Sequence, residues 1–172
     1  MPRLLVCPLS ALDASLRDYA PSHLVSLLSP QHMIETPAGF DPARHLRLGM
    51  EDVGDPAAAD NPPGSDHVEQ LLAFGRGWDA GAPLVIHCWA GISRSMASAF
   101  VILCDRLGPG REIDIALAMR RRAPHASPNP LLVRHADDML ERSGRMVAAL
   151  GAMGQPFSMM EGIPTAFPLV GL

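Results

Sequence analysis

One of the few cysteines in this chain lies in a setting that suits nucleophilic chemistry. The chain has three cysteines in 172 residues. Cys88 follows the apolar run Leu84–His87, precedes a stretch of small residues, and is followed six positions later by Arg94. A cysteine thiolate is a strong nucleophile, and the planar guanidinium of arginine can hold two oxygens of a phosphate. The spacing therefore predicts a cysteine nucleophile beside an anion site.

The residues around Cys88 predict a strand, a tight loop and a helix. Leu84–His87 (LVIH) has the uninterrupted apolar character of a buried parallel strand, and from about Ser93 apolar residues recur at helical spacing. The amide groups at a helix N-terminus attract anions, and they also favour a thiolate. Ser95 would donate a hydrogen bond to the sulfur. The residues expected to bind phosphate, sulfate or vanadate are Trp89, Ala90, Gly91, Ile92, Ser93 and Arg94.

The same residues carry a resemblance to a known superfamily. His87-Cys88, Gly91 and Arg94-Ser95 form the pattern H-C-x-x-G-x-x-R-S, which resembles the signature of the cysteine-dependent protein tyrosine phosphatases. The fuller stretch is most similar to the dual-specificity branch and its small bacterial relatives. Arg121, followed by Ser127-Pro128-Asn129, is similar to a stretch that follows the signature helix in that branch.

The resemblance implies a phosphatase that needs neither a metal nor another cofactor. Cys88 would attack phosphorus while Arg94 and the loop amides hold the phosphate oxygens. A carboxylic acid would protonate the departing oxygen, and water would then hydrolyse the cysteinyl-phosphate. His87 would form a hydrogen bond to the backbone and support Cys88.

The side chains of the loop bear on the substrate. Arg94 is the only basic residue in the loop, whereas phosphatases of highly phosphorylated inositol rings tend to carry more. Trp89, Ala90 and Ile92 form an apolar rim instead. This favours a phosphorylated protein or another aromatic phosphate monoester, with phosphotyrosine as the first choice and phosphoserine and phosphothreonine as alternatives.

The resemblance places the general acid on a loop after a strand, roughly 30 to 40 residues before the nucleophile. Asp52 and Asp55 lie 36 and 33 residues before Cys88 (88 − 52 and 88 − 55). Asp52 follows the predicted strand His45–Met50 almost directly, so it is the preferred acid and Asp55 is the alternative. The same loop also carries Glu51 and Asp60.

Two other functions stay open at this point. A non-catalytic phosphate-binding module would keep Arg94 and the loop but lack a working acid. A rhodanese-like sulfurtransferase also places a cysteine in an anion-binding loop, although the arrangement of His87, Cys88, Arg94 and Ser95 disfavours it. Turnover of a phosphate ester separates the phosphatase from the binding module, and thiosulfate:cyanide transfer identifies the sulfurtransferase.

Strands alternate with helices along the chain, which predicts an α/β fold. We expect a central, mostly parallel sheet of about four to five strands flanked by helices, as in protein tyrosine phosphatases. Residues 1–150 would form a single domain, and 151–172 an extended or mobile C-terminal tail. The expected strands are Arg3–Cys7, His23–Leu28, His45–Met50 and Leu84–His87, and the expected helices are 65–78, 93–107, 112–122 and 131–150.

Composition and charge narrow the partners and the location. All 14 basic residues are arginine. The net charge is −4, so the chain lacks the excess of positive charge that nucleic-acid binding requires. No apolar run approaches 18 residues, so we expect no membrane span, and the N-terminus lacks the apolar core of a secretory signal. The seven histidines lack metal-ligand spacing. Cys7 and Cys104 are expected in the core, and the odd number of distant cysteines favours a reducing, cytoplasmic location.

Overall fold

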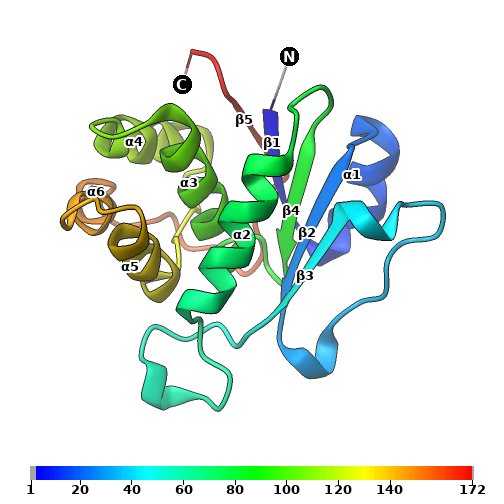
Figure 1. Cartoon of the computed structure of the whole chain (residues 1–172), viewed down its shortest axis with the longest axis horizontal. Helices are drawn as coiled ribbons and strands as arrows, with labels where there is room; N and C mark the ends of the chain where they lie inside the picture. The colour runs from blue at the N-terminus through cyan, green and yellow to red at the C-terminus, as the bar shows by residue number, and fades with distance from the viewer. Residues whose placement is uncertain (1–2, 172) are drawn as a thin grey trace.

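The computed structural model describes residues 3–171 and contains a five-stranded sheet with helices on both faces (Figure 1). The sheet order is β3-β2-β4-β1-β5. β5 runs antiparallel to β1, and the other neighbouring strands are parallel. The predicted α/β class and mostly parallel sheet are therefore confirmed. The strands are β1 (Arg3–Pro8), β2 (His23–Leu28), β3 (His45–Gly49), β4 (Leu84–Cys88) and β5 (Thr165–Pro168).

The helices form two layers, one on each face of the sheet, and the layers contain different numbers of helices. α1 packs on one face of the sheet, and α2 to α6 form the layer on the other face (Figure 1). Within residues 3–171, no helix is both long and apolar enough to cross a membrane. The helices are α1 (Leu12–Tyr19), α2 (Ser65–Gly77), α3 (Arg94–Leu107), α4 (Glu112–Arg122), α5 (Pro130–Met139) and α6 (Arg145–Ala152).

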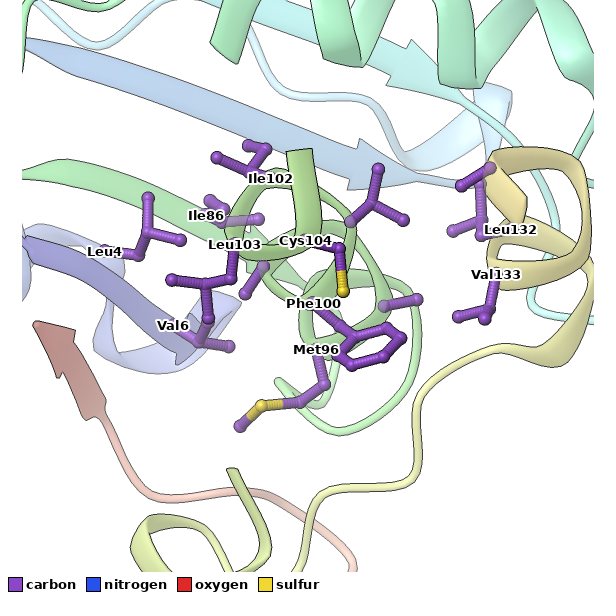
Figure 2. Close-up of a cluster of buried hydrophobic side chains, with 14 of the residues drawn as sticks. Leu4, Val6, Ile86, Met96, Phe100, Ile102, Leu103, Cys104, Leu132 and Val133 are labelled. Atoms are coloured by element: carbon purple, nitrogen blue, oxygen red, sulfur yellow. The ribbon is translucent and has the colours of Figure 1, made fainter. Parts of the chain in front are cut away.

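α3 lies at the centre of the thicker layer. Every residue from Arg94 to Cys104 is buried, as expected for a helix that is covered on all sides. Figure 2 shows side chains of α3, among them Phe100 and Cys104, packed between the β1–β4 part of the sheet and α5. This packing holds the N-terminus of α3 rigidly at the end of β4, where the predicted phosphate loop lies.

The long helix predicted over 131–150 is wrong, because the chain breaks between α5 and α6. Glu141, Ser143 and Gly144 have positive φ angles of 53°, 53° and 83°, which a continuing helix cannot accommodate. The buried carboxylate of Asp137 accepts hydrogen bonds from the amides that begin α6. An aspartate in this position satisfies amides that would otherwise lack partners, so it starts a new helix.

Two short elements were not predicted at all. α1 has only eight residues. β5 pairs with β1 inside the segment 151–172, for which we expected an extended or mobile tail, and its Phe167 is fully buried. A four-residue edge strand is too short to show the alternation of apolar and polar residues by which strands are predicted.

Candidate active site

Cys88 is the last residue of β4, and its side chain lies at the floor of the loop that leads to α3. The side chain is 1% exposed. Its Sγ accepts a hydrogen bond from the Gly91 amide at 3.2 Å and lies 3.1 Å from Oγ of Ser95. Two donors on one sulfur stabilise negative charge there, so the surroundings of Cys88 suit a thiolate.

The loop between Cys88 and Arg94 is held from outside by three distant segments. Its backbone carbonyl groups accept hydrogen bonds from amides before α1, after α4 and in the C-terminal segment. The amides of Ala90, Ile92 and Ser93, in contrast, donate to no backbone carbonyl within residues 3–171. They remain available for an anion. The outer bonds are Leu9 N–H to Trp89 O at 3.1 Å, Gly162 N–H to Ala90 O at 2.7 Å and Ser127 N–H to Ile92 O at 3.0 Å.

Gly91 is required by its conformation and by its surroundings. Its φ angle is +69°, in the left-handed region that disfavours residues with a side chain. A Cβ at this position would lie 2.6 Å from the backbone nitrogen of Pro8 and 2.8 Å from the carbonyl carbon of Cys7. Only glycine allows the loop to wrap this tightly against the end of β1.

Arg94, the first residue of α3, carries a buried donor without a partner. Its side chain is 7% exposed, and Nη1 donates to the carbonyl oxygen of Met50 at 2.8 Å. Nε is fully buried and has no hydrogen-bond partner among the described residues. A buried donor left unpaired costs about 1–3 kcal/mol, which an anion bound in the loop would recover.

The structure brings Asp52 to this loop. Its Oδ1 accepts hydrogen bonds from Oγ of Ser93 at 2.6 Å and from Nδ2 of Asn129 at 3.0 Å. Its Oδ2 lies 3.9 Å from Nε of Arg94. One carboxylate oxygen therefore fixes the position of the side chain, and the other lies near Nε of Arg94 without a hydrogen bond among the described residues.

Asn129 positions Asp52 and was missed as a functional residue by the sequence analysis. Its Nδ2 donates to both Asp52 and the carbonyl oxygen of Val53, while its Oδ1 accepts the amides of Leu131 and Leu132 at the start of α5. The loop that carries Asp52 (residues 51–64, called the acid loop below) is thereby tied to the start of α5. An asparagine directly before Pro130 is a typical helix N-cap, and this is the signal that could have marked the residue.

Asp55 and Glu51, two other acidic side chains of the acid loop, form their hydrogen bonds away from the loop between Cys88 and Arg94. Asp55 is exposed and accepts the amide of Ala57 at 2.9 Å, which caps a short 3-10 helix. Glu51 accepts a hydrogen bond from Ser29 at 2.6 Å, and this bond lowers the pKa of Glu51. Within residues 3–171, Asp52 is the acidic side chain that forms a hydrogen bond to the phosphate loop.

His87 belongs to a buried chain of hydrogen bonds next to Cys88. Its Nε2 lies 2.6 Å from Oγ of Ser26, which lies 2.8 Å from Nε2 of His45. Nδ1 of His45 in turn lies 2.9 Å from Oγ1 of Thr36. Burial lowers the pKa of His87 and of His45 to about 4 each, so both rings are neutral near pH 7.

These two histidines predict a loss of stability in mild acid. Each has an ordinary pKa of 6.5 and a pKa of about 4 in the folded chain. Between these values the unfolded chain binds protons that the folded chain does not, so the free energy of unfolding falls as the pH drops from 6.5 to 4. One such histidine contributes about 3 kcal/mol to this fall. Urea unfolding at several pH values measures it.

Replacing one histidine tests the assignment. His45→Gln is expected to make this fall with pH shallower, because one of the two histidines with a folded-state pKa of about 4 is gone. His135→Gln, at a partly exposed position on α5, is the matched control and is expected to keep the wild-type pH dependence. An unchanged pH dependence in His45→Gln would contradict the prediction.

Cys7 and Cys104 are buried in the core, as predicted. Cys7 packs with α1, whereas Cys88 packs on the other face of the sheet with α3. Burial raises the pKa of Cys7 to about 11, and it also raises the pKa of Cys104. Both thiols therefore stay protonated and unreactive near neutral pH.

Comparisons with known proteins identify the fold. Neither a family model nor a curated protein matches the chain. Among solved structures, DUSP15 is 20% identical with a TM-score of 0.57, over 92% of this chain and 94% of that chain. Human DUSP28 is 22% identical with a TM-score of 0.60, over 80% and 88%. The human tyrosine phosphatase-like serine/threonine/tyrosine-interacting protein is 18% identical with a TM-score of 0.63, over 81% and 91%.

The chain therefore shares its fold with these proteins. The resemblance that the residues around Cys88 predicted is confirmed for the fold. The bacterial type stays a prediction.

Proposed function

We propose that this protein is a metal-independent phosphatase that hydrolyses phosphate monoesters through a cysteinyl-phosphate on Cys88. The observation that carries the proposal is the buried Nε of Arg94, which has no hydrogen-bond partner among the described residues. It lies beside a loop in which three amides also lack carbonyl partners within residues 3–171. Together they form a site for the three equatorial oxygens of a phosphoryl group. The sulfur of Cys88 lies in the same loop with two donors that stabilise its charge.

The residues support a reaction in two steps. Sγ of Cys88 attacks phosphorus, the bond from phosphorus to the leaving oxygen breaks, and Asp52 gives its proton to that oxygen. Water then attacks the cysteinyl-phosphate and passes a proton to Asp52. The bond from sulfur to phosphorus breaks, so that phosphate is released and the Cys88 thiolate is restored. Oγ of Ser95, 3.1 Å from the sulfur, stabilises the departing thiolate.

Phosphotyrosine is the favoured substrate, with phosphoserine and phosphothreonine as alternatives. Trp89 is 58% exposed and meets the ring of His32 edge-on, with 5.6 Å between the centroids. Both residues line a cavity of about 190 Å³ with Arg94. An aromatic wall beside the phosphate clamp favours an aryl phosphate. The structure of PTPMT1 was solved with PI(5)P, but acidic residues line the mouth of this site, which disfavours rings with several phosphates.

Asp52→Asn is expected to lower kcat for a phosphotyrosine peptide by roughly 10²- to 10⁴-fold, because the leaving oxygen loses its proton donor. The effect on p-nitrophenyl phosphate should be smaller, since p-nitrophenol leaves readily without a proton. The measurement is the pH–rate profile of both substrates in EDTA. Loss of the alkaline limb of the profile in Asp52→Asn would mark Asp52 as the acid.

Asp55→Asn is the matched control for this experiment. The residue lies on the same loop, but its carboxylate caps the 3-10 helix Pro56–Ala58. It is expected to keep kcat within a few-fold of wild type. If Asp55→Asn loses the alkaline limb while Asp52→Asn keeps it, the assignment of the acid is wrong although the phosphatase proposal stands.

A further inference from the structure

A second cavity lies just outside the phosphate loop, on the side of the C-terminal segment. It has a volume of about 350 Å³. It is lined by Trp89 and Ala90 of the phosphate loop, by Met160 and Glu161 of the C-terminal segment, and by Leu9 and Ser10. Figure 1 shows the C-terminal segment, drawn in orange to red, crossing from α6 to β5. The cavity therefore adjoins the place where a residue next to the phosphorylated residue of a substrate would lie.

Glu161 is held at this cavity by the packing of its neighbour. The amide of Gly162 donates to the carbonyl oxygen of Ala90 at 2.7 Å. A Cβ on Gly162 would lie 2.8 Å both from the carbonyl oxygen of Gly91 and from Nε2 of His125, so the backbone fits closely there. The hydroxyl of Ser10 donates to Oε1 of Glu161. The backbone next to Glu161 is thus tied to the phosphate loop, and Ser10 binds the carboxylate itself.

The charge of Glu161 is not neutralised by the described part of the chain. No ion pair of Glu161 occurs within residues 3–171, and its Oε2 forms no hydrogen bond there. The indole of Trp89 opposite is 58% exposed. A carboxylate and an exposed indole that line the same cavity are complementary to a guanidinium or ammonium group, through a charged hydrogen bond and a cation–π contact.

The other side of the active site adds to the same preference. Glu51, Asp52 and Asp60 line the cavity that leads to Arg94. Arg94 is the only lysine or arginine that lines either cavity, and it is buried. A negative rim around a deep anion site attracts a substrate that carries positive charge beside its phosphate and repels an acidic one.

We propose that the cavity between Trp89 and Glu161 binds an arginine or lysine side chain next to the phosphorylated residue of a peptide substrate. This inference rests on the proposed phosphatase function and adds the class of substrate. Glu161 is then a specificity-determining residue for peptide substrates. A small aryl phosphate has no flanking residue that Glu161 could bind.

The test compares three phosphotyrosine peptides that differ only in the flanking residues, which are arginine, alanine or glutamate. Wild type is expected to show kcat/KM roughly tenfold higher for the arginine peptide than for the alanine peptide, and lower still for the glutamate peptide. Glu161→Gln should reduce the arginine-to-glutamate ratio about tenfold. Taking the ratio within each variant cancels any general effect on the phosphate loop.

Glu69→Gln is the matched control, since Glu69 is an exposed residue of α2, and it should keep the wild-type ratio. Fluorescence anisotropy of the same peptides with Cys88→Ser gives the ratio of affinities independently of turnover. Equal values for the three peptides in both measurements, or a ratio that Glu161→Gln leaves unchanged, would overturn the inference. A preference in binding without turnover in wild type would support the cavity while overturning the phosphatase proposal.

Discussion

Replacing Cys88 with serine is expected to lower kcat by roughly 10⁵-fold or more, for p-nitrophenyl phosphate and phosphotyrosine peptides alike. A serine hydroxyl is not ionised near neutral pH, and no base lies in the loop to activate it. The fold should persist, because serine is smaller than cysteine and its oxygen can accept from Gly91 and Ser95, the groups now near Sγ. Phosphate and phosphopeptide binding should also persist, since Arg94 and the loop amides are unchanged.

Cys104→Ala provides the matched control for the loss of a thiol. Cys104 is buried in the core on α3, and its raised pKa keeps it protonated. The variant is expected to unfold more easily and to turn over substrate like wild type. Mass spectrometry of wild type quenched during turnover should find one phosphate on Cys88.

Three outcomes would redirect the proposal. Turnover by Cys88→Ser within tenfold of wild type would exclude the cysteinyl-phosphate. Absence of turnover in wild type, with vanadate still bound through Arg94, would favour the non-catalytic phosphate-binding module. Thiosulfate:cyanide transfer that depends on Cys88 would favour the sulfurtransferase.

The parts of the fold and site that the sequence predicts well are local in the chain. The strand β4, the small-residue loop and the start of α3 are continuous, so apolar runs and the spacing from Cys88 to Arg94 describe them. The four predicted strands, three from apolar runs and one from alternation, all occur in the sheet. Asp52 was chosen because it follows a strand, and the structure places it beside the loop for the same reason.

What the sequence does not predict depends on contacts between distant segments. Asn129 reaches Asp52 across 77 positions, and Ser26 joins His87 across 61. Gly162, in the C-terminal segment, donates a hydrogen bond to the phosphate loop. No hydrophobic periodicity in that segment predicts a helix or a strand. Periodicity and capping rules report on neighbours in the chain, so they carry no information about which loop a distant amide will meet.

Arg94→Lys is expected to lower kcat/KM by roughly 10³-fold or more, although the charge is kept. The present guanidinium performs two tasks at once, because its groups are fixed in one plane. Nη1 donates to the carbonyl oxygen of Met50, two residues before Asp52, while Nε has no hydrogen-bond partner among the described residues and would bind phosphate. A lysine ammonium on its flexible chain can satisfy one of these sites but not both.

The measurement that separates the two tasks pairs vanadate inhibition with the pH–rate profile. Losing the clamp weakens vanadate binding, and losing the bond to Met50 frees the acid loop, so that proton transfer by Asp52 becomes less efficient as well. Arg76→Lys is the matched control. Arg76, near the end of α2, forms an exposed ion pair with Asp105 of α3, so the variant should leave both readouts at wild-type values. Vanadate affinity in Arg94→Lys equal to wild type would show that the orphaned Nε is not the phosphate ligand. Because one planar group links the phosphate loop to the strand end that carries the acid, the arginine couples binding of the phosphate to the position of its proton donor.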